Sequence, residues 1–544
     1  MKSTTCYSIL FFLFIGLAAL AATASPDANG AWGWESILPA TLAILLAFLF
    51  RQVFLALFFG IWVGAWLLNG LTLESIFSSM LDVVDPFLMR ALVPEDGSTD
   101  HMAIVIFTLL TGGMIGVISR NGGMAGIVRY LSRFANNRKR GQASAYGLGF
   151  LIFFDDYANT LIVGKTMQPL MDKLKISREK LAFLVDSTAA PVAALALAST
   201  WIGFQVSLMD DAIAGIDGFE MQGYNLFLSA LPYSFYPILM LVFIAIVIKT
   251  GRDFGPMLTA ERAVQAGEKS LGHMDDAQDD AEEATPKAWL GLLPILTLIF
   301  MTMGGLWWTG EGSGIKEILG SADPFSSMVW ASISALLLAL LISVATKALS
   351  IGQAMAAMER GFAPMLMAVM ILTFAWGIAD VNAALGTADY VTSLLGDTMA
   401  AEWLPLAVFA FAALTAFATG TSWGTMAILI PLILPLGWQL LSNQGMADAA
   451  HYHILYAAVA SVMAGAVWGD HCSPISDTTI LSSLASNCSH IEHVRTQLPY
   501  ALAVAGTAIA TCIIPAGFGL HWAICLGLGC VGLYLITRKF GKAA

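Results

Sequence analysis

Long apolar stretches separated by short polar segments make up most of the chain. A helix needs about 20 apolar residues to cross the ~30 Å hydrocarbon layer of a membrane. Windows near that length predict eleven membrane-spanning helices, at residues 36–50, 53–69, 102–119, 179–208, 225–249, 288–308, 326–346, 362–384, 453–486, 498–517 and 519–537.

Two further apolar regions, 142–172 and 403–440, are interrupted near their middle by the polar stretches FFDDYANT and ATGTSWGT. Each interruption leaves two apolar halves of about 15 residues, which are too short to cross a membrane alone. We therefore predict two re-entrant helical hairpins. Basic residues flank the first hairpin, so it should enter from the cytoplasm, whereas acidic residues flank the second, which should enter from outside.

The Lys and Arg residues support this arrangement, because cytoplasmic loops carry most of the positive charge near the ends of spans. With the N-terminus outside, 22 of the 26 Lys and Arg residues fall on the cytoplasmic side, and only Arg90 and Lys316 fall outside. Counting either hairpin as one full crossing would destroy this separation. We therefore expect a multi-pass protein of the cytoplasmic (inner) membrane, with its mature N-terminus outside and its C-terminus in the cytoplasm.

Three other segments complete the layout. Residues 1–24 combine Lys2, an apolar run and a small-residue cleavage site, which predicts a signal peptide; an uncleaved first span is the alternative. The acidic segment 251–287 predicts a mobile cytoplasmic linker. Segments 121–137 and 385–400 are typical either of interfacial amphipathic helices or of loops.

Composition indicates the same class of protein. Of 544 residues, 58% are hydrophobic and 12% charged, and the mean hydropathy of +0.75 excludes a soluble enzyme core. The formal net charge of −12 says little about a ligand, because nine acidic residues lie in 253–283. No zinc spacing and no P-loop motif occurs, so we expect no enzyme activity, no cofactor and no nucleic-acid partner.

Four motifs of the first half recur, in the same order, in the second. The matched positions are Trp34 with Trp289, Thr111 with Thr373, Thr160 with Thr425, and Asp186 with Asp470. The first unit begins outside and the second inside, so the two units have opposite orientation, as in many secondary transporters. The chain is thus divided into repeats at 25–250 and 288–544, the second with an extra C-terminal helix.

Polar residues interrupt the pattern at four places that form two related pairs. One pair is the hairpin tips, at 155–160 and 419–425. The other lies in full spans, where proline removes a helical donor and predicts helix breaks at 186–191 and 470–474. Unwound chain at membrane depth is tolerated only where protein or a wet cavity surrounds it, and freed carbonyl groups suit a small hard cation. The predicted fold is therefore an all-α polytopic membrane protein with inverted structural repeats, about eleven transmembrane helices, two re-entrant helical hairpins and two broken helices.

Five carboxylates lie near these breaks, namely Asp155, Asp156, Asp186, Asp470 and Asp477. A carboxylate at the centre of a membrane costs about 2.5–3.5 kcal/mol, which favours a functional role. Several negative charges at one site raise the pKa of some of them, so a proton and a metal cation can compete.

Structural roles are the alternative for several of these residues. Asp155 and Asp186 are also typical of helix caps or packing groups, and Asp477 of the cap of a helix that resumes after Pro474. His471 suits either a proton carrier or a core histidine. Asp380 and Asn382, near the outer end of a span, are interpreted as gating or packing groups.

The stretch GDHCSPISDTTILSS, together with GTSWGT, FFDDYANTLIVG and DSTAAPVA, resembles the NhaC family of Na⁺/H⁺ antiporters over nearly the whole mature chain. The resemblance implies a cation-coupled secondary transporter with a mobile transport unit beside a scaffold, often as a homodimer in the lipid bilayer. It implies cation and proton binding by Asp155, Asp156, Asn159, Thr160, Asp186, Asp470, Ser473 and Asp477, with Na⁺ as the only metal. The supporting positions at the tips and breaks would be Ser187, Thr188, Pro191, Thr421, Ser422, Thr425, His471, Pro474 and Thr478.

We therefore expect exchange of Na⁺ for H⁺ by alternating access, with intramembrane aspartates shared between the two ions. An alternative is Na⁺- or H⁺-coupled exchange of a small organic acid or amino acid, whose carboxylate would bind the N–H groups of the hydroxyl-rich tips. A non-transporting sensor that uses the cytoplasmic linker is a third hypothesis.

Overall fold

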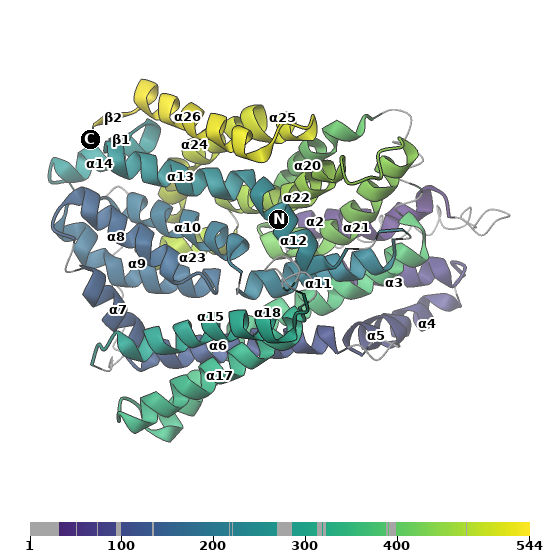
Figure 1. The fold of residues 1–544 in the computed structure, drawn as a ribbon, viewed down its shortest axis with the longest axis horizontal. Helices are drawn as coiled ribbons and strands as arrows, with labels where there is room; N and C mark the ends of the chain where they lie inside the picture. Colours follow the sequence, from purple (N-terminus) through teal and green to yellow (C-terminus); the bar gives the residue numbers. More distant parts are fainter. Residues whose placement is uncertain are drawn as a thin grey trace, which may run out of the picture.

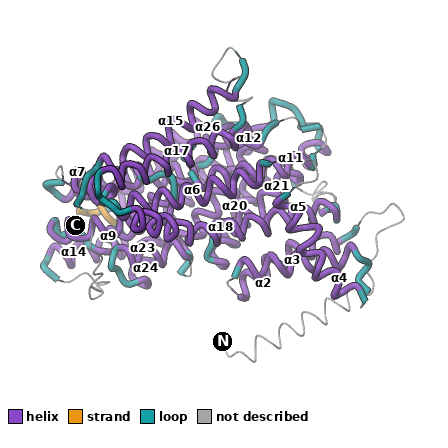
Figure 2. The backbone as a smooth tube through the Cα atoms, turned by 90° about the horizontal axis from the view of Figure 1, so that it is seen from below, coloured by secondary structure: helices purple, strands orange, loops and turns teal. Residues whose placement is uncertain are grey.

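The computed structural model describes residues 32–50, 52–72, 74–93, 99–132, 135–197, 199–216, 218–219, 221–268, 285–312, 318, 322–387, 390, 399–474 and 476–543. The predicted signal peptide, residues 269–284 of the acidic linker and most of segment 385–400 lie outside these residues. Figure 2 shows that the described chain is almost entirely helical.

The protein is a multi-pass membrane protein. By length and composition, eight described helices can cross a membrane, or ten if each of two bent pairs counts as one span. The prediction of eleven spans included residues 36–50 and 53–69, which form the shorter apolar helices α2 (Leu38–Phe50) and α3 (Val53–Leu68).

One group of helices contains α6, α15 and α17, which lie along the lower edge of Figure 1. In it α6 packs against α17 and α18, and α15 packs against α17. Besides α2 and α3, the group comprises η1 (Trp34–Ile37), α4 (Ser75–Asp82), η2 (Val83–Leu88), α5 (Met89–Leu92), α6 (Asp100–Arg120), α7 (Gly123–Ser132), α15 (Trp289–Thr309), α17 (Pro324–Ala345) and α18 (Ile351–Ala384). Helix α7 falls in the segment 121–137, for which an interfacial helix was one of the two expectations.

The second group holds, from each half of the chain, a helical hairpin followed by a broken helix. From the first half these are the hairpin α8 (Arg138–Leu151) and α9 (Asp156–Lys173), then α10 (Arg178–Leu195) and α11 (Thr200–Ala214). From the second half they are the hairpin α20 (Leu404–Thr419) and α21 (Ser422–Asn443), then α22 (Tyr452–Cys472) and α23 (Asp477–Ala485). The arms of the second hairpin are longer than the sequence predicted, since α21 has 22 residues.

The remaining helices of this group cover α10 and α23 from above in Figure 1. Both α13 and α24 pack against α10, and α26 packs on α13. These covering elements are α12 (Gly223–Ala230), η3 (Leu231–Tyr233), α13 (Phe235–Thr250), η4 (Ala401–Trp403), α24 (His490–Ala508), η5 (Ile509–Ile513), α25 (Ile514–Gly517) and α26 (Trp522–Phe540).

The start of the predicted mobile linker is folded. Strand β1 (Arg252–Asp253) pairs antiparallel with β2 (Lys542–Ala543), and helix α14 (Gly255–Gln265) follows. The buried Asp253 carboxylate forms an ion pair with Lys180 of α10 and accepts a hydrogen bond from the Tyr500 hydroxyl at 2.6 Å. Burial raises the pKa of Glu261 in α14, which forms an ion pair with Arg138. These contacts explain why an acidic segment is ordered here, because its carboxylates have cationic partners.

Small residues bring α6 and α18 into close contact. A Cβ atom on Gly361 would lie 2.1 Å from the backbone oxygen of Gly112, and one on Gly116 would lie 2.2 Å from the oxygen of Ala357. Helix association within a membrane depends on such close packing, because lipid provides no hydrophobic drive between helices.

We predict that the same substitution changes the thermal stability differently at two positions of α18. Gly361→Ala should lower the thermal unfolding temperature of the purified protein, because the new methyl group must push α6 away. Gly352→Ala is the matched control and should not lower it, since nothing lies within 4 Å of a Cβ atom there and alanine is the better helix former. Equal unfolding temperatures for the two variants would contradict this account of the α6–α18 contact.

Candidate functional site

The first hairpin turns at residues 152–155 and is held together by a buried amide. Asn159 Nδ2 donates hydrogen bonds to the carbonyl oxygens of Gly149 at 2.7 Å and Ile152 at 3.2 Å, and lies 3.4 Å from that of Thr188 in α10. Asn159 thus satisfies carbonyl groups that the turn removes from the helix, as membrane burial requires. The predicted interruption is confirmed at Asp155, but Asp156 to Thr160 already form the first turns of α9.

The second hairpin turns within two residues. Gly420 has a left-handed backbone conformation, with φ of 73°, and Thr421 caps α21 by accepting a hydrogen bond from the Gly424 N–H at 3.4 Å. Ser422 and Thr425 lie in the first turn of α21, and the Thr425 hydroxyl donates to the Thr421 oxygen at 2.9 Å. The polar tip predicted from the sequence is therefore mainly a helix start.

The predicted break at 186–191 is wrong. Helix α10 continues through Pro191 to Leu195, and the chain leaves helical geometry at Ala196. The break lies after Ala196 because the first hairpin tip provides hydrogen-bond acceptors there. The Thr200 N–H donates to the Phe154 oxygen at 3.0 Å, and the Thr200 hydroxyl donates to Asp155 Oδ2 at 3.3 Å. The hairpin tip thus supplies the acceptors that an unwound segment needs.

The second broken helix lies close to its predicted position. Helix α22 ends at Cys472 and α23 begins at Asp477, so Pro474 is in the break and Asp470 is in the last turn before it. The Ser473 hydroxyl donates to the Phe417 oxygen at 2.6 Å, and Ser422 donates to Asp470 Oδ2 through both its N–H, at 3.2 Å, and its hydroxyl. In both halves, therefore, the hairpin tip is hydrogen-bonded to the broken helix that follows it.

Asp186 lies where the two halves meet. It is fully buried in α10, and its Oδ2 atom accepts a hydrogen bond from Gln497 Nε2 and lies 3.4 Å from His493 Nε2. The Thr479 hydroxyl lies 3.5 Å from the same oxygen and 2.9 Å from the Asp470 carbonyl oxygen. The Thr479 hydroxyl therefore lies between Asp186 of the first half and Asp470 of the second half.

Several buried polar atoms near these breaks have no hydrogen-bond partner among the described residues. On α9 and α10, which pack together, they are Asn159 Oδ1, Thr160 Oγ1, Asp186 Oδ1 and Ser187 Oγ. An unmade hydrogen bond at a buried group costs about 1–3 kcal/mol, so each such atom calls for an occupant. Oxygen atoms alone make up this set, which is the ligand type that hard cations prefer.

The other predicted site residues have partners or lie outside what is described. The Thr188 hydroxyl donates to the Leu184 oxygen of its own helix at 2.7 Å, and the Thr478 hydroxyl contacts that of Ser476 at 3.0 Å. His471 Nδ1 lies 2.9 Å from the Tyr236 hydroxyl. Asp477 begins α23, but its side chain is outside the described part of the structure.

The aspartates are spread over three contacts. Asp155 lies at the first hairpin tip. Asp470 lies on α22 and contacts the second tip through Ser422. Asp186 lies on α10, between the two halves of the chain. Within the described ranges, no group of three or more His, Cys, Asp or Glu side chains could hold a metal ion. A cation there would therefore be held by hydroxyl, amide and single carboxylate oxygens.

Sequence reasoning missed Thr200, Thr479, His493 and Gln497. The signal for the last two was present, because His493 and Gln497 are four residues apart and hence on one helix face. They precede the apolar window 498–517, whereas the helix that carries them begins at His490.

Comparison with known proteins agrees with this architecture. Residues 192–516 match the Na⁺/H⁺ antiporter family. The chain belongs to this family. An uncharacterized protein of Haemophilus influenzae is 32% identical over 492 residues, which cover 89% of this chain and 91% of that protein. The predicted resemblance to NhaC-type antiporters is thereby confirmed.

Two solved structures share the fold of this antiporter-family member. The YdaH transporter of Alcanivorax borkumensis, described as having an unusual topology, is similar with a TM-score of 0.55 at 16% identity, over 84% of this chain and 89% of that one. MtrF of Neisseria gonorrhoeae, described within a class of antimetabolite efflux pumps, gives a TM-score of 0.50 at 14% identity over 84% of each chain. Together with the family match, the fold identifies the protein as a secondary transporter.

We predict that the Thr479 hydroxyl stabilises the contact between the halves. Thr479→Val should lower the free energy of unfolding by about 1–2 kcal/mol, because a buried acceptor loses its donor. Thr479→Ser should restore most of it, since the hydroxyl returns. Chemical denaturation in detergent measures the effect.

The matched control is Thr297→Val, where the hydroxyl donates only to the Leu293 oxygen of its own helix. If Thr297→Val lowered the free energy of unfolding as much as Thr479→Val, the prediction that the Thr479 hydroxyl stabilises the contact between the halves would be wrong.

Proposed function

We propose that this transporter exchanges Na⁺ for H⁺ across the cytoplasmic membrane by alternating access. The observation that carries the proposal is the set of buried, unpartnered oxygens on α9 and α10, which includes Asp186 Oδ1. Hard cations bind carboxylate, hydroxyl and amide oxygens, and the interrupted helices of transporters supply such sites near the middle of the membrane.

Asp186 is the carboxylate that best suits competition between the two ions. One of its oxygens is engaged by Gln497, while the other has no hydrogen-bond partner in the described structure. A bound cation neutralises the carboxylate, and a proton does the same when the cation leaves. Each ion thus stabilises the site only in the absence of the other, which is the requirement for exchange.

We propose that Asp470 couples the charge of Asp186 to the position of the second hairpin tip. It binds both the N–H and the hydroxyl of Ser422, and its backbone oxygen accepts from Thr479, which also reaches Asp186. A change in charge at Asp186 therefore acts on the contact that holds the second tip. Movement of the tips relative to the broken helices would then open the site to one side of the membrane at a time.

The orientation that we propose follows the distribution of positive charge, with the N-terminus outside and the C-terminus in the cytoplasm. The ion pairs of β1 and α14 with α8 and α10 then lie at the cytoplasmic end.

Flux through reconstituted protein tests the exchange directly. In proteoliposomes, an imposed Na⁺ gradient should drive protons in the opposite direction, followed with a pH-sensitive dye in the lumen. Asp186→Asn and Asp470→Asn should each reduce this flux at least about tenfold, because an amide cannot be shared between a proton and a cation. Absence of Na⁺-driven proton movement from about pH 6 to pH 9, with folded protein, would refute the proposal.

The control for these variants is Asp448→Asn, which makes the same change in an exposed loop. It should retain the wild-type flux. Thermal unfolding of each variant separates loss of transport from loss of folding.

The unpartnered oxygens predict an effect on affinity alone. Thr160→Val and Ser187→Ala should each raise the Na⁺ concentration for half-maximal flux by about tenfold while leaving the maximal rate nearly unchanged, because a cation ligand is lost but the carboxylate remains. Thr166→Val on the same helix is the matched control, since the Thr166 hydroxyl already donates to the Ile162 oxygen. A fall in maximal rate without a change in apparent affinity would argue against cation ligation by these hydroxyls.

A further inference from the structure

A cavity of about 450 Å³ lies away from the hairpin tips, between the C-terminal parts of α11, α18 and α21. Cavities of this size are typical of sites for small organic molecules, and they far exceed the space that a single ion occupies. In the proposed orientation it lies at the outer end of the protein.

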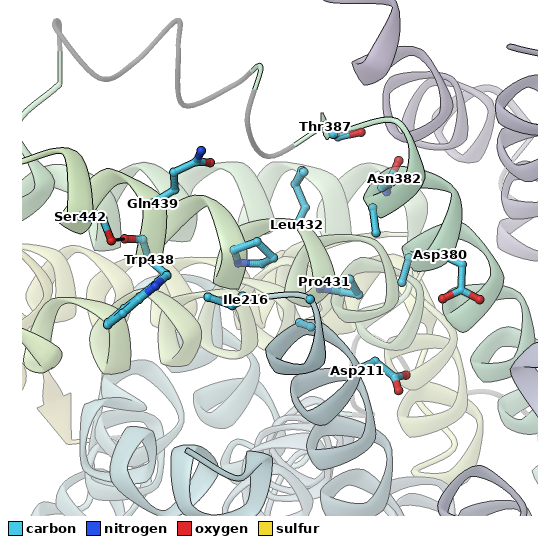
Figure 3. A pocket seen from close by; sticks show the side chains of 16 residues that line it. Asp211, Ile216, Asp380, Asn382, Thr387, Pro431, Leu432, Trp438, Gln439 and Ser442 are labelled. Atoms are coloured by element: carbon cyan, nitrogen blue, oxygen red, sulfur yellow. Dashed lines mark hydrogen bonds between the residues drawn. The ribbon is translucent and has the colours of Figure 1, made fainter. Parts of the chain in front are cut away.

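The charged side chains that line the cavity are both acidic. Asp211 of α11 and Asp380 of α18 lie on one side of it, as Figure 3 shows, and no Lys, Arg or His is among its described lining residues. His101 bonds Asp211 Oδ1 at 2.8 Å, but Asp211 Oδ2 is buried without a hydrogen-bond partner in the described structure. The acidic side of the cavity therefore offers one buried acceptor that needs a donor, Asp211 Oδ2, and a second, exposed carboxylate at Asp380.

A neighbouring amide independently points to an occupant. Asn382 is 7% exposed and lines the cavity, yet neither its oxygen nor its nitrogen has a hydrogen-bond partner among the described residues. A buried amide without partners is unfavourable by about 1–3 kcal/mol for each unmade hydrogen bond. Asn382 is two residues from Asp380 on α18, and both residues line the cavity.

The rest of the wall is mixed, because Thr387, Gln439 and Ser442 line it together with apolar and aromatic residues. Pro431 and Leu432 of α21 form its middle, and Trp438 lies at the side opposite the aspartates. A solute that fits both ends carries a hydrogen-bond-donating cation at one end and an apolar body at the other. Ammonium groups satisfy carboxylate acceptors through three donors, and an aromatic ring at the other end of the cavity provides a surface for the apolar body.

We propose that this cavity binds a small organic ammonium ion with an apolar body. The ammonium group lies against Asp211 and Asp380, Asn382 offers a further polar contact in the same cavity, and the apolar body lies along α21. This site is separate from the proposed cation site and requires no exchange of Na⁺ for H⁺.

Direct binding to the full chain in nanodiscs tests the proposal. Benzylammonium is the probe, and isothermal titration should show saturable binding of one probe per chain above the signal of empty nanodiscs. Benzyl alcohol has the same shape without the charge and should bind at least about tenfold more weakly, because a neutral hydroxyl makes a weaker hydrogen bond to a carboxylate than an ammonium group does. Equal affinity for the two compounds, or no saturable binding of benzylammonium to folded protein, would overturn the proposal.

Variants localise the binding. Asp380→Asn should weaken benzylammonium binding at least about tenfold, and Asp448→Asn, outside the cavity, should not change it. Ala383→Phe keeps both aspartates but fills the space next to Asn382, and it should block binding as well. Unchanged affinity in folded Asp380→Asn and Ala383→Phe would place the probe elsewhere and overturn the proposal.

The same experiment is independent of the exchange proposal. Asp470→Asn should lose Na⁺-driven proton flux but keep wild-type affinity for benzylammonium. Binding without any flux in the wild-type protein would refute ion exchange alone, and flux without binding would refute the ammonium site alone.

Discussion

The constraint on which the structure depends is that every backbone N–H and carbonyl group inside a membrane needs a partner. The two hairpins and the two broken helices that follow them interrupt the described helices at four places, and each interruption would leave such groups unsatisfied. The structure solves the problem by pairing the interruptions. The Phe154 oxygen of the first hairpin tip accepts the Thr200 N–H of the first helix break, and the Phe417 oxygen near the end of α20 accepts the Ser473 hydroxyl of the second break. Each tip is thus required by the break that follows it in the chain.

This pairing also positions the aspartates, but differently in the two halves. In the first half, the tip aspartate Asp155 contacts the helix break through Thr200. In the second half, the aspartate is on the broken helix, and the tip contributes Ser422. The hydrogen-bonding neighbours of the Asp186 carboxylate in the described structure are Thr479 on α23 and His493 and Gln497 on α24, all in the other half. The asymmetry leaves one carboxylate where both halves can affect its charge, which a pair of identical sites would not achieve.

The sequence reveals the tips much better than the breaks and their partners. Asp155 and Gly420 interrupt apolar stretches that are too long for one span. The length of the stretch and, at Gly420, the conformational freedom of glycine predict a turn there from local sequence alone. Pro191 misplaced the first break, because proline in a membrane helix is tolerated when neighbours satisfy the freed carbonyl groups, and the break position was set by the hairpin tip. Contacts such as that of Asp186 with Gln497 join residues more than 300 positions apart, so no pattern along the chain specifies them.

Two helices connect the proposed cation site with the ammonium cavity. Helix α11 begins with Thr200 at the first tip and carries Asp211 at the cavity, while α21 begins with Ser422 beside Asp470 and carries Trp438 at the cavity. A helix transmits a displacement along its axis because its hydrogen bonds keep it rigid. An occupant of the cavity therefore influences the tips if it binds one arrangement of α11 and α21 more tightly than another, and the size of that influence equals the difference between the two binding free energies. By the same relation, such a coupling would be reciprocal, and without a difference between those binding free energies the two sites are independent.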